Sequence, residues 1–152
     1  MSAFKLSGKI TGLDRLNKKL DLFKKEVLAN QVTAMQDATF MLHSAAVNLI
    51  QDNADGRPEK RYNPKRVVNV SRPGEAPNTD TGRLVQSIKF DFKDGGLRGR
   101  VGTNLKYGAA LEFGTSKMDA RPWLSTAVLL VSKEVAKIFA AAFKKSTKEV
   151  SE

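Results

Sequence analysis

The stretch I-K-F-D-F-K-D-G-G-L-R-G-R-V-G-T, residues 88–103, decides the fold, because it predicts a β-hairpin between segments with helical patterns. Every second residue from Ile88 to Phe92 is apolar, which is typical of a strand with one buried face. Asp94-Gly95-Gly96 has the composition of a tight turn. Leu97 and Val101 are placed to pair with the first strand from the second.

Residues 107–113, on the C-terminal side of the hairpin, predict a short helix. Tyr107 and Leu111 fall on one face at helical spacing, and Gly114 sits where a helix-ending glycine belongs. The small residues between them permit close packing, and we expect Tyr107, Leu111 and Phe113 to anchor the helix. Farther on, Pro122 is placed to open a last helix over 122–148.

The segments before the hairpin are a short helix and a long one. Asp80 or Thr81 can cap a helix that runs to about Ser87. Residues 12–51 carry apolar residues at steps of three and four, with a phase slip near residues 29–31, so they predict one long helix or two in line. About 40 helical residues would span roughly 60 Å. Part of the apolar stripe, Leu16 and Leu20 included, is therefore expected to need a partner chain.

Residues 52–81 hold four of the five prolines and show no helical period. We expect a long flexible loop there, with a brief extended piece near Val67. The densest positive charge of the chain lies within this segment, in residues 57–72, where Glu59 is the only acidic residue, and we expect it to dock onto an acidic protein surface. The basic residues are Arg57, Lys60, Arg61, Lys65, Arg66 and Arg72.

Composition limits the remaining possibilities. The chain has 152 residues, 41% apolar and 28% charged, with no cysteine and a formal net charge of +10. A single domain is expected at this length, and disulfides and thiol chemistry are excluded. Residues 3–10 alternate as a short strand. The predicted fold is α+β, with long N-terminal and C-terminal helices packed on a small antiparallel sheet.

Nothing in the sequence predicts catalysis or a bound cofactor. The only histidine, His43, has no second histidine and no carboxylate at the spacing of a metal site, so we expect a structural role. Motifs of hydrolases, zinc proteases and nucleotide phosphatases are missing. Glu112 lacks a nearby group that would tune it for proton transfer. We expect it to pair with Arg83, Lys117 or Arg121.

Three segments together identify a resemblance. They are T-G-R-L-V-Q-S-I (81–88), V-G-T-N-L-K-Y-G-A-A-L-E-F-G-T (101–115) and A-R-P-W-L-S-T-A (120–127). In this order they resemble the tail-completion and head–tail connector, or neck, proteins of long-tailed bacteriophages, including lambdoid-type minor tail proteins. The resemblance covers residues 79–130. Two mild departures are Gly108, where members often have alanine, and Trp123, where phenylalanine is common.

The resemblance implies a virion structural protein without enzymatic activity, assembled in the host cytoplasm. It implies a homo-oligomeric, hexameric ring at the neck, between the capsid connector and the tail-tube proteins, with no membrane contact. It also assigns assembly or structural roles to one set of residues. These are Thr81, Gly82, Arg83, Leu84, Ser87, Tyr107, Glu112, Phe113, Gly114, Thr115, Arg121, Pro122 and Trp123.

Two other functions fit parts of the sequence. The net charge and the basic segment would suit a nucleic-acid-binding module, and a neck ring surrounds the path of the genome. However, Tyr62 is the only aromatic residue among the basic ones, whereas single-strand binders usually interleave several. An enzyme would rest on Glu112 and Asp80 alone. For the basic segment itself, protein docking is favoured over DNA contact, because a channel that binds phosphate groups would retard ejection of the genome.

Overall fold

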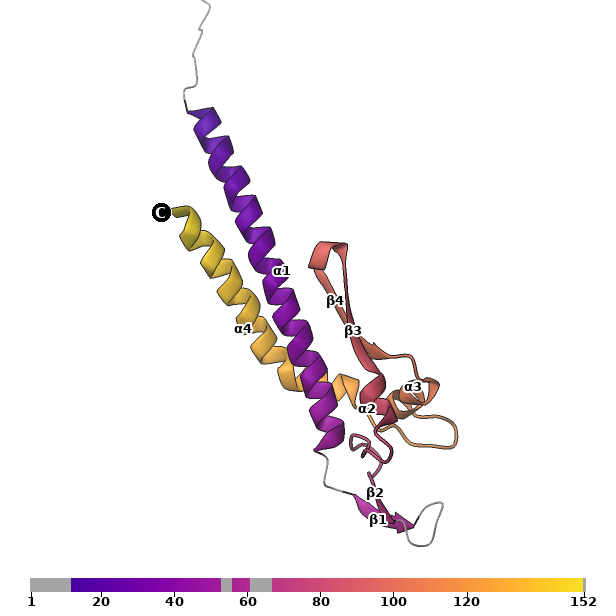
Figure 1. The fold of residues 1–152 in the computed structure, drawn as a ribbon. Coiled ribbons are helices and arrows are strands. Elements are labelled where there is room, and N and C mark those ends of the chain that lie inside the picture. Colours follow the sequence, from indigo (N-terminus) through magenta and orange to yellow (C-terminus); the bar gives the residue numbers. More distant parts are fainter. Residues whose placement is uncertain (1–11, 53–55, 61–66, 152) are drawn as a thin grey trace, which may run out of the picture.

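The computed structural model of the chain describes residues 12–52, 56–60 and 67–151. Two long antiparallel helices, α1 and α4, form one side of the molecule, and a β-hairpin with two short helices lies against the C-terminal half of α1 (Figure 1). This arrangement confirms the predicted α+β class. The predicted strand at 3–10 and the basic residues Arg61, Lys65 and Arg66 lie outside the described residues.

Helix α1 spans Leu13–Gln51 without interruption, so the phase slip near residue 30 does not divide it. Its 39 residues extend over about 58 Å. The backbone N–H of Asp52 donates to the carbonyl of Asn48, which closes the last turn. Figure 1 shows that the N-terminal end of α1 projects past the end of α4.

Helix α4 spans Leu124–Ser151 and packs mainly along α1. The predicted bounds, 122–148, were wrong at both ends, because the helix begins two residues after Pro122 and continues three residues past residue 148. The start is set by a carboxylate that binds the N–H groups of residues 123–125, as described below. Near the other end, the buried Ser146 hydroxyl accepts a hydrogen bond from the Asn30 side chain at 3.0 Å. Residues of α1 before Asn30 therefore reach toward and beyond the end of α4.

The predicted hairpin consists of β3, Ile88–Lys93, and β4, Arg98–Thr103, joined by the 3₁₀ turn Asp94–Gly96. Phe90 lies opposite Val101 in the antiparallel register. Leu97 does not pair as expected, because the turn ends there and the last pair of the ladder is Lys93 with Arg98.

The hairpin packs against the middle of α1 through one face. The Phe40 ring of α1 meets Phe90 edge-on, with ring centroids 4.9 Å apart, and Phe92 at 6.0 Å. On β4 the residue opposite Phe92 is Gly99, and a side chain there would collide with Thr39 of α1. Gly99 thus allows β4 to lie close to α1, and the rings of Phe90 and Phe92 pack β3 against Phe40 of the same helix.

A second two-stranded hairpin lies in the segment predicted as a loop. Strand β1, Arg57–Lys60, pairs with β2, Val67–Val70, in antiparallel register. The extended piece expected near Val67 is β2, whereas β1 was not predicted because it contains proline and three charged residues. After β2 the chain returns to the body, where Val70, Ser71 and Ala76 are buried. The segment is therefore not loop throughout.

The core lies where the C-terminal half of α1 meets the short helices α2, Arg83–Ser87, and α3, Lys106–Phe113, together with the start of α4. The residue that caps α2 is Gly82, with no side-chain capping bond, so the predicted Asp80 or Thr81 cap was wrong. A glycine with φ of 73° turns the chain directly into the helix there. The buried cluster comprises Ala46, Ile50, Leu84, Ile88, Trp123 and Ala127.

Candidate functional site

The residues of the three sequence segments meet at the junction between α3 and α4. Glu112, on the last turn of α3, directs its carboxylate at the first turn of α4. One oxygen accepts the backbone N–H groups of Trp123 and Leu124, each at 2.8 Å, and the other accepts that of Ser125 at 2.9 Å. N–H groups at a helix start have no partner within the helix. Glu112 therefore acts as a cap supplied from another helix.

Burial and hydrogen bonding act on this carboxyl group in opposite directions. Desolvation tends to raise the pKa of Glu112. Hydrogen bonds from the Ser125 side chain and from the N–H groups of Leu124, Ser125 and Trp123 lower it, and together they prevail. The pKa of Glu112 therefore lies below its ordinary value, as suits a permanent anion at the positive end of a helix.

The expected cation partners of Glu112 are replaced by backbone groups. Arg121 instead contributes to the junction in two other ways. Its backbone N–H donates to the Leu111 carbonyl at 2.7 Å, and its guanidinium donates to the Ser71 hydroxyl at 3.3 Å. The loop before α4 is thereby tied both to α3 and to the chain that follows β2. Arg83 and Lys117 lie exposed.

Trp123 fills the centre of the junction and is only 2% exposed. Its indole N–H donates to the Gly108 carbonyl at 3.1 Å, which joins the start of α4 to the first turn of α3. A Cβ at Gly108 would lie 2.5 Å from the Thr103 side chain. Glycine at this position therefore suits the close contact between α3 and the end of β4.

The chain between α3 and α4 makes a tight reversal. Gly114 ends α3 with φ of 74°, as predicted, and a Cβ there would meet the backbone of Ala120 at 2.9 Å. Thr115 and Met118 exchange backbone hydrogen bonds of 2.7 and 3.2 Å across the turn. Pro122 follows, and its carbonyl accepts the Thr126 hydroxyl.

The first segment, residues 81–88, supports the junction from the other side of α3. Leu84 is buried in the core. The Ser87 hydroxyl bonds the Leu84 carbonyl at 2.7 Å and the Thr103 hydroxyl at 2.6 Å. Thr81, Gly82 and Arg83 line a surface pocket with Tyr107. Most of the predicted assembly residues thus fall into an interior group around Trp123 and an outer group at this pocket, whereas Phe113 and Thr115 are exposed and belong to neither.

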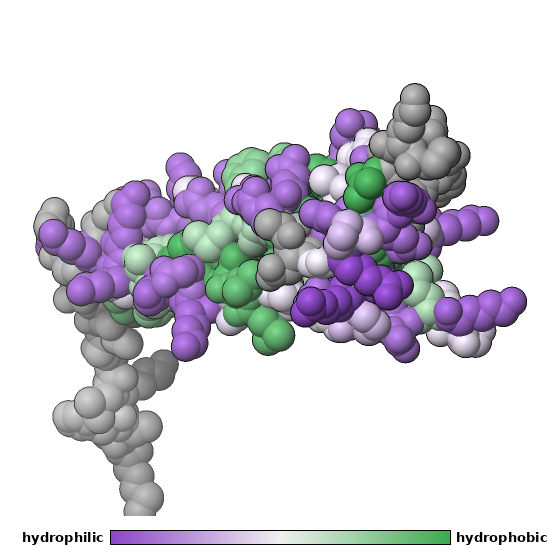
Figure 2. Space-filling view, turned by 90° about the horizontal axis from the view of Figure 1, so that it is seen from below, coloured by the Kyte–Doolittle hydropathy of each residue, from purple (hydrophilic) through white to green (hydrophobic). Residues whose placement is uncertain are grey.

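Two aromatic residues do not anchor α3 as expected. Phe113 is 83% exposed and Tyr107 is 43% exposed. The helix turns Gly108 into the core instead, because β4 approaches too closely for a larger side chain. Other apolar side chains are exposed as well, notably Leu129 on α4. Figure 2 shows apolar residues gathered among hydrophilic ones on the face seen from below.

The basic segment contributes a separate polar surface. Arg57, Lys60 and Arg72 are exposed, and the backbone N–H of Arg72 donates to the Glu75 carboxylate at 2.9 Å. Gly74 N–H donates to the Ala120 carbonyl at 2.9 Å, which attaches this segment to the loop before α4. The charged surface is therefore held next to the junction by the backbone.

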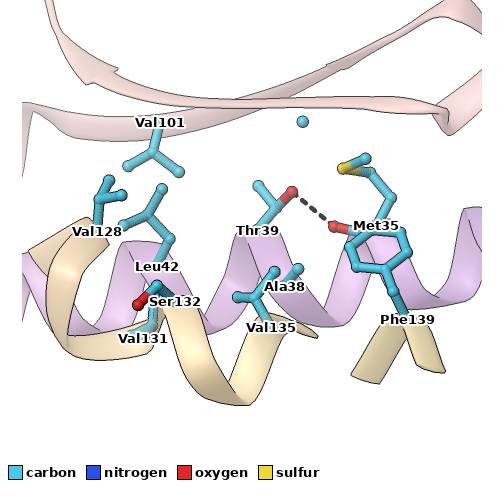
Figure 3. A pocket seen from close by; sticks show the side chains of 11 residues that line it. Met35, Ala38, Thr39, Leu42, Val101, Val128, Val131, Ser132, Val135 and Phe139 are labelled. Atoms are coloured by element: carbon cyan, nitrogen blue, oxygen red, sulfur yellow. Dashed lines mark hydrogen bonds between the residues drawn. The ribbon is translucent and has the colours of Figure 1, made fainter. Parts of the chain in front are cut away.

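A groove that was not predicted runs between β4 and α4, with α1 as its floor (Figure 3). Its volume is about 390 Å³, and nearly all of its lining is apolar. The only signal in the sequence was the apolar face of the last helix, which did not indicate where that helix would pack. The principal lining residues are Met35, Ala38, Leu42, Val101, Val128, Val131, Val135 and Phe139.

The described residues offer no arrangement for metal chemistry, since no three His, Asp or Glu side chains among them are grouped for a metal ion. His43 is part of the packing, with its Nε2 3.3 Å from the Ile88 carbonyl oxygen and its ring edge-on to Phe90. Within the described ranges, no helix combines the length and apolar character needed to cross a bilayer. The geometry is that of a structural junction beside exposed apolar and basic surfaces.

Comparison with protein families gave one match. The family model described as "Bacteriophage HK97-gp10, putative tail-component" matches residues 14–114. This range runs from the first turn of α1 to the glycine that ends α3. It includes the first resembling segment and the second as far as Gly114, whereas Thr115 and the third segment, residues 120–127, lie beyond it. The comparisons with curated proteins and with solved structures gave no match.

Proposed function

Because the chain belongs to the HK97-gp10-like family of bacteriophage tail components, we propose that it is a non-enzymatic structural protein of the phage neck. Copies of it join into a ring between the head connector and the tail tube, and the protein resides in the virion after assembly in the host cytoplasm.

The observation that carries this proposal is the apolar stripe on the projecting end of α1. Leu13, Leu16 and Leu20 recur at helical spacing and are 48%, 54% and 51% exposed. They precede Asn30, the α1 residue that meets the end of α4, so α4 does not cover them. An apolar stripe on a single projecting helix is stabilised when another surface removes it from water.

A closed ring needs two different complementary surfaces on every copy, because each subunit contacts its neighbours head to tail. The leucine stripe supplies one such surface. Phe113 and Leu129, which are 83% and 74% exposed near the α3–α4 junction, mark a second apolar region at the opposite end of the helix pair. Having both regions on one chain supports a ring over an isolated monomer.

The direct test is the mass of the purified protein across a range of concentrations, alone and with the neighbouring connector and tail-tube proteins. Sedimentation velocity is expected to show a discrete oligomer under at least one of these conditions, and electron microscopy is expected to show rings. A monomer under all of them would contradict the proposal.

Replacing Leu16 and Leu20 together by serine is expected to weaken self-association strongly while lowering the free energy of unfolding by only about 1 kcal/mol. Both side chains are half exposed, so the monomer loses little buried surface. A matched control replaces Lys18 and Glu26 by serine, which keeps the helix-propensity cost and the net charge. Sedimentation and thermal unfolding measure the two effects. Equal loss of association in both variants would show that the leucines are not the contact.

The basic segment is proposed to dock onto an acidic surface of a neighbouring neck protein. Replacing Arg57, Lys60 and Arg72 by serine is expected to slow association with that neighbour about tenfold at low salt, because opposite charges steer the encounter. The difference should shrink as salt is raised. Stopped-flow or surface-binding kinetics provide the measurement.

The control for this variant replaces Lys89, Lys133 and Lys144, which are exposed elsewhere, and so removes the same charge from other faces. Equal slowing by both variants would show that only net charge matters. Binding of the wild type to random DNA with a steep salt dependence, lost in the first variant alone, would assign the segment to the genome instead.

A further inference from the structure

The groove between β4 and α4 continues toward the α3–α4 junction. Val128 of α4 lines it and also lines a second hollow of about 440 Å³ bounded by Gly102, Thr103 and Phe113. Both hollows are almost entirely apolar, and together they follow the length of β4. Val128 itself is 45% exposed at their meeting point. The molecule thus has one long apolar groove beside one strand.

The strand that borders this groove has an unpaired edge. The hairpin sheet contains β3 and β4 alone, and within the described residues the other edge of β4 has no strand partner. That edge faces α4, since β4 and α4 line the groove together and no residue of β3 does. Figure 3 shows the hairpin above α1, with Val101 and Val128 approaching each other across the groove. An open edge offers backbone N–H and C=O groups to an added strand.

The sequence supplies a candidate strand in residues 3–10, which lie outside the described part. Phe4, Leu6 and Ile10 alternate there with polar residues. A strand requires an edge to pair with. The edge of β4 suits this one best because the groove beside it can bury Phe4 and Leu6. Strand β1, in contrast, is mostly exposed and carries charged side chains.

The segment cannot reach this edge within its own chain. Ala3 is nine residues before Gly12, so it extends at most about 32 Å from the start of α1. Thr39, against which Gly99 of β4 packs, lies 27 residues beyond Gly12, or about 40 Å along α1. Residues closer to Gly12 fall shorter still. A strand added at this edge must therefore come from another copy.

We propose that residues 3–10 of one copy add as a strand to the free edge of β4 in the next copy, with Phe4 and Leu6 buried in the groove beside α4. This inference rests on the proposed ring and names a contact between its subunits. The contact joins two different surfaces, a terminal segment and a groove, as head-to-tail closure requires.

Charge gives the contact a distinctive salt dependence. If Phe4 and Leu6 face the groove, Lys5 and Lys9 face the same side as Arg98 and Arg100 of β4, which are exposed. Like charges on one face of a sheet repel, and salt screens them. Binding of the segment is therefore expected to strengthen with added salt, opposite to the behaviour expected for the basic segment.

The absence of cysteine from the chain permits a clean cross-linking test. Full-length Leu6→Cys and Val128→Cys proteins are mixed and oxidised, and a covalent heterodimer is expected. The matched control mixes Leu6→Cys with Ala136→Cys, because Ala136 is exposed on α4, lies outside both hollows and is not part of the apolar region around Phe113 and Leu129. Disulfides form only between closely placed residues, so this pair should give little product. Equal yields from both mixtures, or cross-links only within a chain carrying both Leu6→Cys and Val128→Cys, would overturn the inference.

A labelled synthetic peptide of residues 1–12 tests the groove independently of ring formation. It is expected to bind the full-length chain saturably, and more tightly at higher salt. The substitution Val128→Glu should weaken binding by at least about tenfold, because it places a charge in the apolar groove, whereas Ala136→Glu, at an exposed position outside both hollows, should not. The peptide is tested at a protein concentration where the chain is monomeric, so that its groove is not filled by another copy. Absence of peptide binding there, in a chain that forms rings at higher concentration, overturns strand addition alone. Peptide binding to a chain that never forms oligomers supports strand addition and contradicts the ring.

Discussion

Replacing Trp123 with alanine is expected to lower the free energy of unfolding by about 3–5 kcal/mol. Trp123 is 2% exposed at the point where α1, α3 and α4 meet, so its removal leaves a large cavity. The substitution also leaves the Gly108 carbonyl without its indole donor. Trp123 is the only tryptophan, so circular dichroism rather than tryptophan fluorescence should follow unfolding in denaturant.

Two further variants separate packing from hydrogen bonding at this position. Trp123→Phe keeps most of the buried apolar surface and is expected to lose about half as much stability, since a smaller cavity and one unpaired carbonyl remain. Phe113→Ala removes an aromatic ring that is 83% exposed, and should change stability by less than about 0.5 kcal/mol. A loss below about 1 kcal/mol in Trp123→Ala would mean that the junction is not part of the cooperative core.

Replacing Glu112 with alanine is expected to cost about 2–3 kcal/mol of unfolding free energy. Three N–H groups at the start of α4 lose their acceptor, and the positive end of the helix loses a nearby anion. Glu112→Gln retains an acceptor without the charge and should lose less. Asp119→Ala, an exposed carboxylate in the preceding loop, is the matched control and should be near neutral.

The pH dependence follows from the lowered pKa of Glu112. A carboxyl group whose pKa is lower in the folded state stabilises the fold above its ordinary value, near 4.5. That stabilisation is lost as pH falls through the lower folded pKa. The stability difference between wild type and Glu112→Gln should therefore be constant above this region and shrink in acid. A difference that stays the same into strong acid would show that the charge of Glu112 has no role.

The elements with local signals could be predicted from the sequence. Alternation and turn composition identified the hairpin at 88–103, and Gly114 marked the end of α3. The role of Glu112 could be predicted only in part. Its structural character followed from the lack of catalytic neighbours, but its partners are backbone groups of α4, and their position depends on how two distant segments pack. The cations Arg83, Lys117 and Arg121 were expected instead because they flank Glu112 in and between the resembling segments.

The predictions that failed depend on the rotation of one element against another. Phe113 and Gly108 lie on different sides of α3, and only the close approach of β4 decides that the glycine faces inward. The groove beside Val128 likewise arises from the line that α4 takes along α1. The pattern of a single sequence identifies the apolar face of a helix. It does not indicate which residues of that face a neighbouring element covers and which remain exposed.

The hydrogen bond between Asn30 and Ser146 helps to fix how far the N-terminal end of α1 projects beyond the end of α4. Sliding α4 along α1 by one turn would move these side chains apart by about 5.4 Å and break their bond, while Ser146 would keep its bond to the Ala142 carbonyl. The bond thus disfavours intermediate and shifted alignments of the two helices. Every copy therefore presents a projecting α1 end of the same length, and in the proposed ring this length would fix the distance between the contacts that one subunit makes with its neighbours.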